Sequence, residues 1–332
     1  MYQQVCIYGV GAIGGWIGAR LGALPGLSLS AVARGPSLAA LQANGLVLQT
    51  AEGAQTVPLR ASASPADLGV QDLVVLAVKA PALPDVARHI APLIGPHTVI
   101  YTAMNGVPWW FLNGFGGAHA HTPLKSIDPH GEIARALPAG QVLGGVVHAS
   151  CSTDGPGQIR HHFGQGLIVG EPDGRTTPRA QALQALLTQA GFDCTLSPCI
   201  QRDIWFKLWG NMTVNPIIAM TGATTDRIMG DPLVVDFISQ VMQEAKAIGA
   251  KLGIVIDQSP EDRHAVTRKL GAFTTSMLQD VRAGRAIELD ALVTSVHELG
   301  ALTSVPTPYT SALLGLARLH GRTHGLYPPA QA

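Results

Sequence analysis

Short apolar runs alternate with turn residues and helical stretches over residues 1–197. The runs predict buried strands bounded by glycine, proline and asparagine. They fall at residues 5–8, 29–33, 72–78, 98–101, 142–149, 157–162, 166–170 and 194–196, with a helix at 178–190 before the last. Strands alternating with helices are typical of an α/β fold. We therefore expect residues 1–197 to form a sheet domain.

The pattern changes near Pro198, after which the hydrophobic spacing is helical. Asp231 followed by Pro232 resembles a helix N-terminus, and Ser259 followed by Asp262 resembles a capping box. Further helices are predicted at residues 274–282, 288–299 and 308–320. Residues 198–332 are therefore expected to form an all-α domain.

The helical stretch 203–215 carries three polar side chains, Lys207, Asn211 and Asn215, at intervals of four. This spacing places them along one face of a helix. Two tryptophans, a phenylalanine and several aliphatic residues occupy the other positions, so the helix is expected to be largely buried. A stripe exposed to solvent is the alternative. The bulky apolar neighbours favour a stripe that faces a polar ligand.

A glycine-rich turn follows the first predicted strand and opens a helix. It reads Gly9, Val10, Gly11, Ala12, Ile13, Gly14, which is the GxGxxG pattern. In this context the first glycine permits the turn, the second lets a pyrophosphate approach the backbone, and the third lets helix pack on strand. The sequence predicts a Rossmann-type doubly wound sheet that binds a dinucleotide. A purely structural turn is the alternative.

Polar residues also follow later strands of the predicted sheet. Arg34 follows the second strand, with no acidic residue at that position to bind a ribose hydroxyl, so we expect NADP (NADPH) rather than NAD. Lys79 and Asn105 follow the next two strands and are expected to reach cofactor or substrate. An exposed loop arginine, a surface lysine and an Asn-Gly turn are the alternatives. The aromatic run 109–111 belongs either to a core or to a pocket mouth.

Composition narrows the function classes. The 332 residues carry equal numbers of acidic and basic side chains, only 13% of residues are charged and 47% are hydrophobic. No basic region is present to attract nucleic acid or anionic lipid, and glycines interrupt the apolar N-terminus, so neither a membrane span nor a signal peptide is expected. Four scattered cysteines suggest a reducing cytoplasm. The histidines have no convincing metal-ligand spacing, so no metal is predicted.

Together these motifs resemble the ketopantoate reductase (2-dehydropantoate 2-reductase) family. Their order is distinctive: GxGxxG, Arg34, Val78-Lys79-Ala80, Asn105-Gly106, the Lys207 helix, then a Ser-Met-Leu-Gln-Asp segment at 276–280 and Ile-Glu-Leu-Asp at 287–290. The resemblance covers residues 9–288, and so both predicted domains. It implies an NADPH-dependent oxidoreductase that reduces a 2-oxo acid, most simply 2-dehydropantoate, in pantothenate and coenzyme A biosynthesis.

The same resemblance implies roles for individual residues. Lys207 would be the general acid, and Glu288 would contact the substrate hydroxyl and the cofactor ribose. Asn211 and Asn215 would orient the substrate, and Ser276 would bind its carboxylate. The remaining implied contacts are to the cofactor: Gly9 to Gly14 at the pyrophosphate, Arg34 and Lys79 near the 2′-phosphate, Asn105 beside both nicotinamide and substrate, and Ala149 lining the cofactor site.

The sequence also departs from the family pattern. The family usually has asparagine eighteen residues after the lysine, where this chain has Thr225, and the aromatic run 109–111 replaces smaller residues. A bulkier 2-oxo acid therefore stays open as the substrate, as does a 3-hydroxyacid or opine-type reaction on the same two-domain plan. A nucleotide-binding sensor without turnover is a further alternative. The assembly is expected to be a monomer or homodimer.

Overall fold

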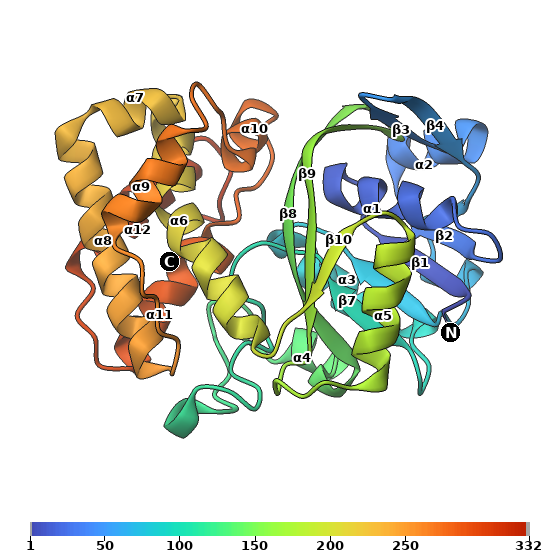
Figure 1. The fold of residues 1–332 in the computed structure, drawn as a ribbon, viewed down its shortest axis with the longest axis horizontal. Helices are drawn as coiled ribbons and strands as arrows, with labels where there is room; N and C mark the ends of the chain where they lie inside the picture. Colours follow the sequence, from blue (N-terminus) through green and yellow to red (C-terminus); the bar gives the residue numbers. More distant parts are fainter. Residues whose placement is uncertain (1, 330–332) are drawn as a thin grey trace. The chain divides into compact units, whose positions relative to one another are not determined.

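The computed structural model describes residues 2–329, which divide into two compact units (Figure 1). The sheet unit contains the described residues up to Met104 together with His130–Asp203. The helical unit contains Asn105–Pro129 and the described residues from Ile204 onward. This division differs from a single cut at 197/198, because residues 105–129 leave the sheet unit and pack with the C-terminal helices.

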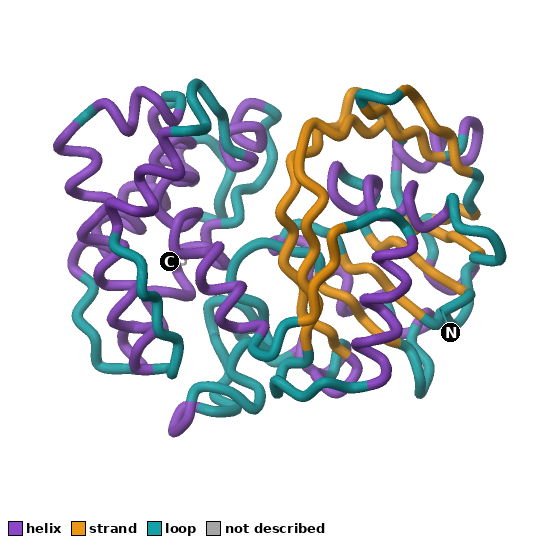
Figure 2. Tube along the Cα trace, viewed as in Figure 1, coloured by secondary structure: helices purple, strands orange, loops and turns teal. Residues whose placement is uncertain are grey.

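The described residues form one ten-stranded mixed sheet, drawn in orange in Figure 2. Its order is β4-β3-β9-β8-β7-β6-β1-β2-β5, with β10 paired to β9. The strands are β1 (Gln4–Tyr8), β2 (Ser28–Val32), β3 (Leu46–Thr50), β4 (Gly53–Val57), β5 (Arg60–Ser62), β6 (Leu73–Leu76), β7 (Val99–Thr102), β8 (Val142–Gly155), β9 (Gln158–Gly170) and β10 (Asp193–Leu196). Strands β2, β1, β6 and β7 are parallel neighbours. Their carboxyl ends therefore lie along one edge of the sheet, as a nucleotide-binding fold requires.

Helices of the sheet unit cover this sheet. They are α1 (Ala12–Gly22), α2 (Gly35–Asn44), α3 (Leu83–His89), α4 (Glu132–Ala136) and α5 (Pro178–Gln189). Helix α1 packs against β3, β8 and β9, and α5 packs against β10. Fully buried Trp16 of α1 joins the strand residues Val5 and Ile7 in one apolar core. This burial explains why these strands read as continuous apolar runs.

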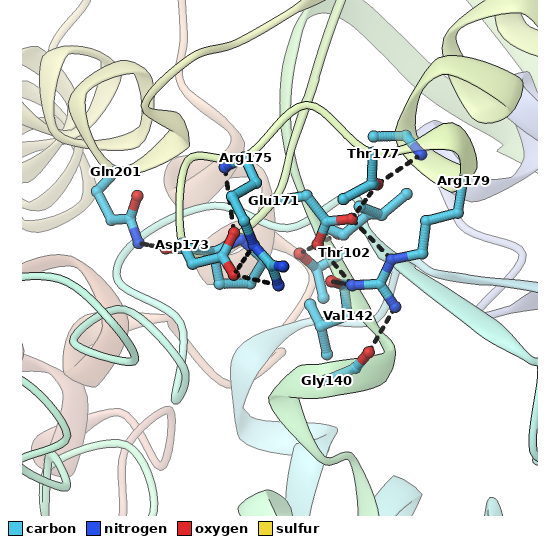
Figure 3. A network of polar contacts seen from close by, with 12 residues as sticks. Thr102, Gly140, Val142, Glu171, Asp173, Arg175, Thr177, Arg179 and Gln201 are labelled. Carbon is cyan, nitrogen blue, oxygen red and sulfur yellow. Dashed lines mark hydrogen bonds and ion pairs between the residues drawn. The ribbon is translucent and has the colours of Figure 1, made fainter.

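A partly buried ion pair fixes the start of α5 (Figure 3). Glu171 follows β9 and accepts hydrogen bonds from the Arg179 guanidinium and the Thr177 hydroxyl. Arg179 also donates to the carbonyl oxygens of Gly140 and Val142, so it connects α5 to the beginning of β8. Because these bonds use most of the N–H donors of Arg179, we assign the ion pair a structural role.

The helical unit contains α6 (Ile200–Thr221, from Ile204 onward), α7 (Thr225–Gly230), α8 (Pro232–Lys251), α9 (Pro260–Arg268), α10 (Ser276–Arg282), a π-helical turn (Asp290–Thr294), α11 (Ser295–Leu302) and α12 (Pro308–Thr323). The capping box predicted at Ser259 and Asp262 is present at the start of α9. Asp231 caps α8 as predicted. The predicted fold class, a Rossmann-type sheet domain followed by an all-α domain, is confirmed.

One local prediction was wrong. The segments 157–162 and 166–170 are not separate strands, because both belong to β9, which pairs with β8 across several register shifts. The helix expected from Glu288 is present from Leu289, and its first turn is π-helical. The pairing of β3 and β4 was not predicted, because their short polar-apolar sequences give no clear periodic signal.

Candidate functional site

The glycine-rich turn has the geometry that a dinucleotide requires. Gly9 has φ +98°, in the region that favours glycine. A Cβ on Gly14 would lie 2.1 Å from the carbonyl oxygen of Gly9, whereas a Cβ on Gly11 would meet no atom within 4 Å. Gly14 thus lets α1 pack close to the turn, and Gly11 leaves open space beside the start of the helix. The residues present fit a bound pyrophosphate.

Arg34 follows β2 and Lys79 follows β6, the two strands that flank β1, on the edge that Gly9 occupies, as predicted. Both side chains are exposed. The Arg34 guanidinium lies 2.8 Å from the carboxylate of Asp85 in α3, a partner that sequence order gave no means of finding. Burial tends to raise the pKa of Asp85, but hydrogen bonds from Arg34 and Arg88 lower it below its usual value. The pair keeps Arg34 at this edge of the sheet.

Ala149 lies where the pairing of β8 with β9 is irregular. The register shifts between His148 and Ser150, and Ala149 is partly buried against the core of the sheet unit. Opposite it, Gly164 has φ +79°, and a Cβ there would lie 2.6 Å from the His148 carbonyl oxygen. A bulge of this kind re-aims the strand locally.

The helical unit gathers a second set of polar residues around α6. Lys207 donates a hydrogen bond from its Nζ to the Oδ1 of Asn105, at 2.7 Å. Asn211 is partly buried and Asn215 is buried, one and two turns farther along the helix. No hydrogen bond joins either amide side chain to another residue within 2–329. Asn215 lies in a largely buried position without a side-chain partner among the described residues, so its amide is suited to a polar ligand.

A tight loop holds Asn105 in place. Gly106 has φ +82°, and a Cβ there would lie 2.4 Å from the carbonyl oxygen of Ala291. The next residue, Val107, donates its backbone N–H to that oxygen at 2.8 Å. Ala291 belongs to the π-helical turn that follows Glu288. The loop and the turn are therefore fastened together, and π-helical turns often occur at functional sites.

Glu288 is buried and close enough to Lys207 to influence its ionisation. Burial lowers the pKa of Lys207 from 10.5 to about 8, and the nearby charge of Glu288 partly opposes that shift. Desolvation of the ammonium therefore outweighs the attraction of the carboxylate. A lysine with this pKa can donate or accept a proton near neutral pH.

The aromatic run after the loop is part of the core of the helical unit. Trp109, Trp110 and Phe111 are all buried, and the ring of Phe111 lies 5.8 Å from that of Trp205 in α6. Of the two interpretations that the sequence left open, the core is the one that the structure supports. The Phe111 ring therefore packs against the helix that carries Lys207.

The described residues contain no cluster of three or more histidine, cysteine or acidic side chains that could hold a metal ion. The four cysteines are free. No helix formed by residues 2–329 combines the length and apolar character needed to cross a membrane.

Family models account for most of the chain. A model described as ketopantoate reductase PanE/ApbA matches residues 5–174, and its C-terminal counterpart matches residues 199–321. The chain belongs to the ketopantoate reductase family. It is therefore an oxidoreductase, and the family depends on a nicotinamide dinucleotide.

Individual relatives of this ketopantoate reductase family member cover nearly the whole chain. A 2-dehydropantoate 2-reductase from Mesorhizobium japonicum is 41% identical, covering 98% of this chain and 100% of its own. A crystal structure from Ralstonia solanacearum MolK2, provisionally described as a ketopantoate reductase, is 54% identical with a TM-score of 0.94, covering 98% and 100%. A 2-dehydropantoate 2-reductase from Geobacter metallireducens GS-15 is 25% identical with a TM-score of 0.82, covering 95% and 99%.

The structure also places Ser276 and Thr225. Ser276 is exposed at the first residue of α10. Thr225, which stands where the family usually has asparagine, is buried. Its hydroxyl donates to the carbonyl oxygen of Gly271 and accepts from the backbone N–H of Phe273 at 3.1 Å. Thr225 therefore fixes the segment that leads to Ser276.

Proposed function

We propose that this protein reduces a 2-oxo acid with NADPH and that the acid is 2-dehydropantoate. The observation that carries the proposal is the arrangement of Lys207 on α6. Lys207 is bonded to Asn105 and influenced by Glu288, and the same helix face holds two amides that have no side-chain partner among residues 2–329. The names of the relatives support the substrate assignment. The preference for NADPH rests on Arg34.

The dinucleotide, when bound, would supply the hydride that adds to the ketone carbon. The electron pair of the C=O π bond would move to the oxygen, which becomes an alkoxide that stays bonded to the carbon. The Lys207 ammonium stabilises this charge and donates the proton that completes the 2-hydroxy acid. Asn105 fixes the position of the ammonium through its hydrogen bond. Glu288 favours the protonated amine, so the acid form persists to higher pH than burial alone would allow.

Binding uses the remaining polar groups. We propose that Asn211 and Asn215 donate to the substrate oxygens and that Ser276 contacts the carboxylate. For the cofactor, the proposed contacts are Gly9 to Gly14 for the pyrophosphate, Arg34 and Lys79 for the 2′-phosphate, and Asn105, Ala149 and Glu288 farther along the dinucleotide. No step in this scheme calls for a metal ion.

The setting is also part of the proposal. Four free thiols support a reducing compartment, for which the cytoplasm is the simplest choice. The assembly, monomer or homodimer, stays a prediction that light scattering of the purified protein would test.

A panel of 2-oxo acids followed by the absorbance of NADPH tests the activity. We expect 2-dehydropantoate to give the highest kcat/KM. Larger 2-oxo acids belong in the panel because Thr225 replaces an asparagine that the family uses at the substrate. A higher kcat/KM for a larger acid would refute the substrate assignment, and NADPH binding without oxidation would refute the activity.

A substitution tests the role of Lys207. Lys207→Ala should lower kcat by roughly 10²–10⁴ while NADPH still binds, because the proton donor is lost. Lys251→Ala, which removes an exposed lysine at the end of α8, is the matched control. Near-normal turnover of Lys207→Ala would show that the acid lies elsewhere.

A further inference from the structure

Arg263 in α9 is a cation with no anionic partner among the residues that the structure describes. Within residues 2–329, no hydrogen bond or ion pair involves its guanidinium, and its Nε is shielded from solvent. Its ring contact is with Phe206, whose centroid lies 5.5 Å from Cζ. Burial lowers the pKa of Arg263 and no carboxylate opposes that shift. Arg263 is partly buried, and a charge that is partly removed from water without a paired anion is well placed to bind an external one.

The fold holds this guanidinium directly against α6. A Cβ on Gly210 would lie 2.8 Å from Nε and 2.9 Å from Nη2 of Arg263. Glycine is therefore the residue that lets the cation approach the helix backbone. Neighbouring His264 anchors α9 through a 2.8 Å hydrogen bond between its Nε2 and the hydroxyl of Ser239 in α8. Arg263 is thus placed by packing rather than by a counter-ion.

Helix geometry relates Arg263 to the polar stripe. Gly210 is three residues after Lys207 and immediately before Asn211. Side chains three apart on a helix are neighbours, with Cβ atoms about 5–6 Å apart. At about 100° per residue, Gly210 and Lys207 are separated by about 60° around α6. Asn211 is about 100° from Gly210, so the guanidinium borders the polar stripe on the side of Lys207.

We propose that Arg263 is a substrate-binding residue that pairs with a carboxylate of the 2-oxo acid. The planar guanidinium can donate two parallel hydrogen bonds to a carboxylate, which a hydroxyl such as that of Ser276 cannot do. This inference rests on the proposed function and extends it, because it makes a carboxylate a requirement for tight binding. The carboxylate is either the one beside the ketone or one at the far end of a dicarboxylic acid.

Four variants test the pairing. Arg263→Gln removes the charge, and Arg263→Lys keeps the charge but loses the planar donor pair. Gly210→Ala keeps the arginine but displaces its guanidinium, and alanine favours the helix, so the fold should be preserved. Arg268→Gln is the matched control, because Arg268 is an exposed arginine of the same helix.

KM and kcat are measured separately for 2-dehydropantoate and for its neutral lactone. The lactone keeps the ketone but has no free carboxylate. Arg263→Gln and Gly210→Ala should raise KM for the acid by roughly 10- to 150-fold, with a smaller rise for Arg263→Lys. KM for the lactone, the dissociation constant of NADPH and the behaviour of Arg268→Gln should change little. An effect confined to dicarboxylic 2-oxo acids would support the pairing and place the carboxylate at the far end.

Other outcomes overturn the inference. An equal loss with acid and lactone, a loss of NADPH affinity, or a lowered melting temperature with unchanged KM would make Arg263 a structural or cofactor residue. If the wild type reduces no 2-oxo acid, the proposed function fails. The pairing of Arg263 with a carboxylate is then tested by the melting temperature of the protein with and without added 2-oxo acids. Stabilisation of the wild type but not of Arg263→Gln by 2-oxo acids would uphold the pairing, and equal stabilisation would refute it.

Discussion

Burial and the charge of Glu288 act in opposite directions on the pKa of Lys207, and burial is the stronger effect. Burial brings its pKa down to about 8 despite the opposing charge of Glu288. Since the ammonium is the proposed proton donor, kcat for reduction should be constant at lower pH and fall as pH rises through about 8. The reverse reaction needs the neutral amine as base, so its kcat should rise over the same range.

Replacing Glu288 tests this account. In Glu288→Gln the opposing charge is gone, so the pKa of Lys207 should fall further and the alkaline limb of the reduction profile should move to lower pH. The measurement is kcat against pH with both substrates saturating. Glu261→Gln, which alters an exposed carboxylate of α9, is the control. An unchanged limb in Glu288→Gln would contradict the coupling.

Arg34 is the residue on which the cofactor preference depends. Arg34→Ala should weaken NADPH much more than NADH, by roughly 10- to 150-fold, because a charge-assisted bond to the 2′-phosphate is lost. Titration of both cofactors by fluorescence measures this directly. Asp85→Asn should act in the opposite direction on NADPH, since it removes the carboxylate that shares the guanidinium. Equal weakening of both cofactors by Arg34→Ala would rule out the assignment.

At the scale of an element, Gly11 and Gly14 of the turn between β1 and α1 have different roles. Gly14→Ala places a methyl group against the Gly9 carbonyl oxygen and should cost about 1–3 kcal/mol of stability. Gly11→Ala meets no protein atom and should leave the melting temperature unchanged. It should instead weaken NADPH on the order of tenfold, by obstructing the pyrophosphate.

Melting curves and NADPH titrations of the two variants separate these effects. The glycine prediction would fail if Gly11→Ala bound NADPH normally or if Gly14→Ala melted like the wild type. Gly140→Ala is a suitable control, because a Cβ there also meets no atom within 4 Å and lies outside the motif.

At the scale of the whole molecule, the helical unit depends on a segment from the middle of the chain. Residues 105–129 supply Asn105 and the buried rings of Trp110 and Phe111. Loss of each large buried ring costs about 3–5 kcal/mol, against about 5–15 kcal/mol for the total stability of a typical domain. A fragment of residues 204–332 should therefore lack a cooperative melting transition.

Joining residues 105–129 to that fragment through a flexible linker should restore the transition, as followed by circular dichroism and tryptophan fluorescence. Cooperative melting of residues 204–332 alone, at the temperature of the linked form, would show that the segment is dispensable.

The sequence determined the elements whose signals are local. The GxGxxG turn, the polar stripe of α6 and the capping box of α9 were all predicted, because backbone sterics and helix periodicity act over a few residues. The fold class followed from the order of these elements. The candidate residues Lys207 and Asn211 could be named for the same reason, although their roles stay predictions.

Only the tertiary structure decided which distant residues meet. Asp85 beside Arg34, Asn105 bonded to Lys207 and Arg263 against Gly210 join positions 51, 102 and 53 residues apart. It also placed the aromatic run in the core and showed burial to outweigh Glu288 at Lys207. Packing and desolvation depend on every neighbour in space, and a single chain of residue types contains no local signal for them.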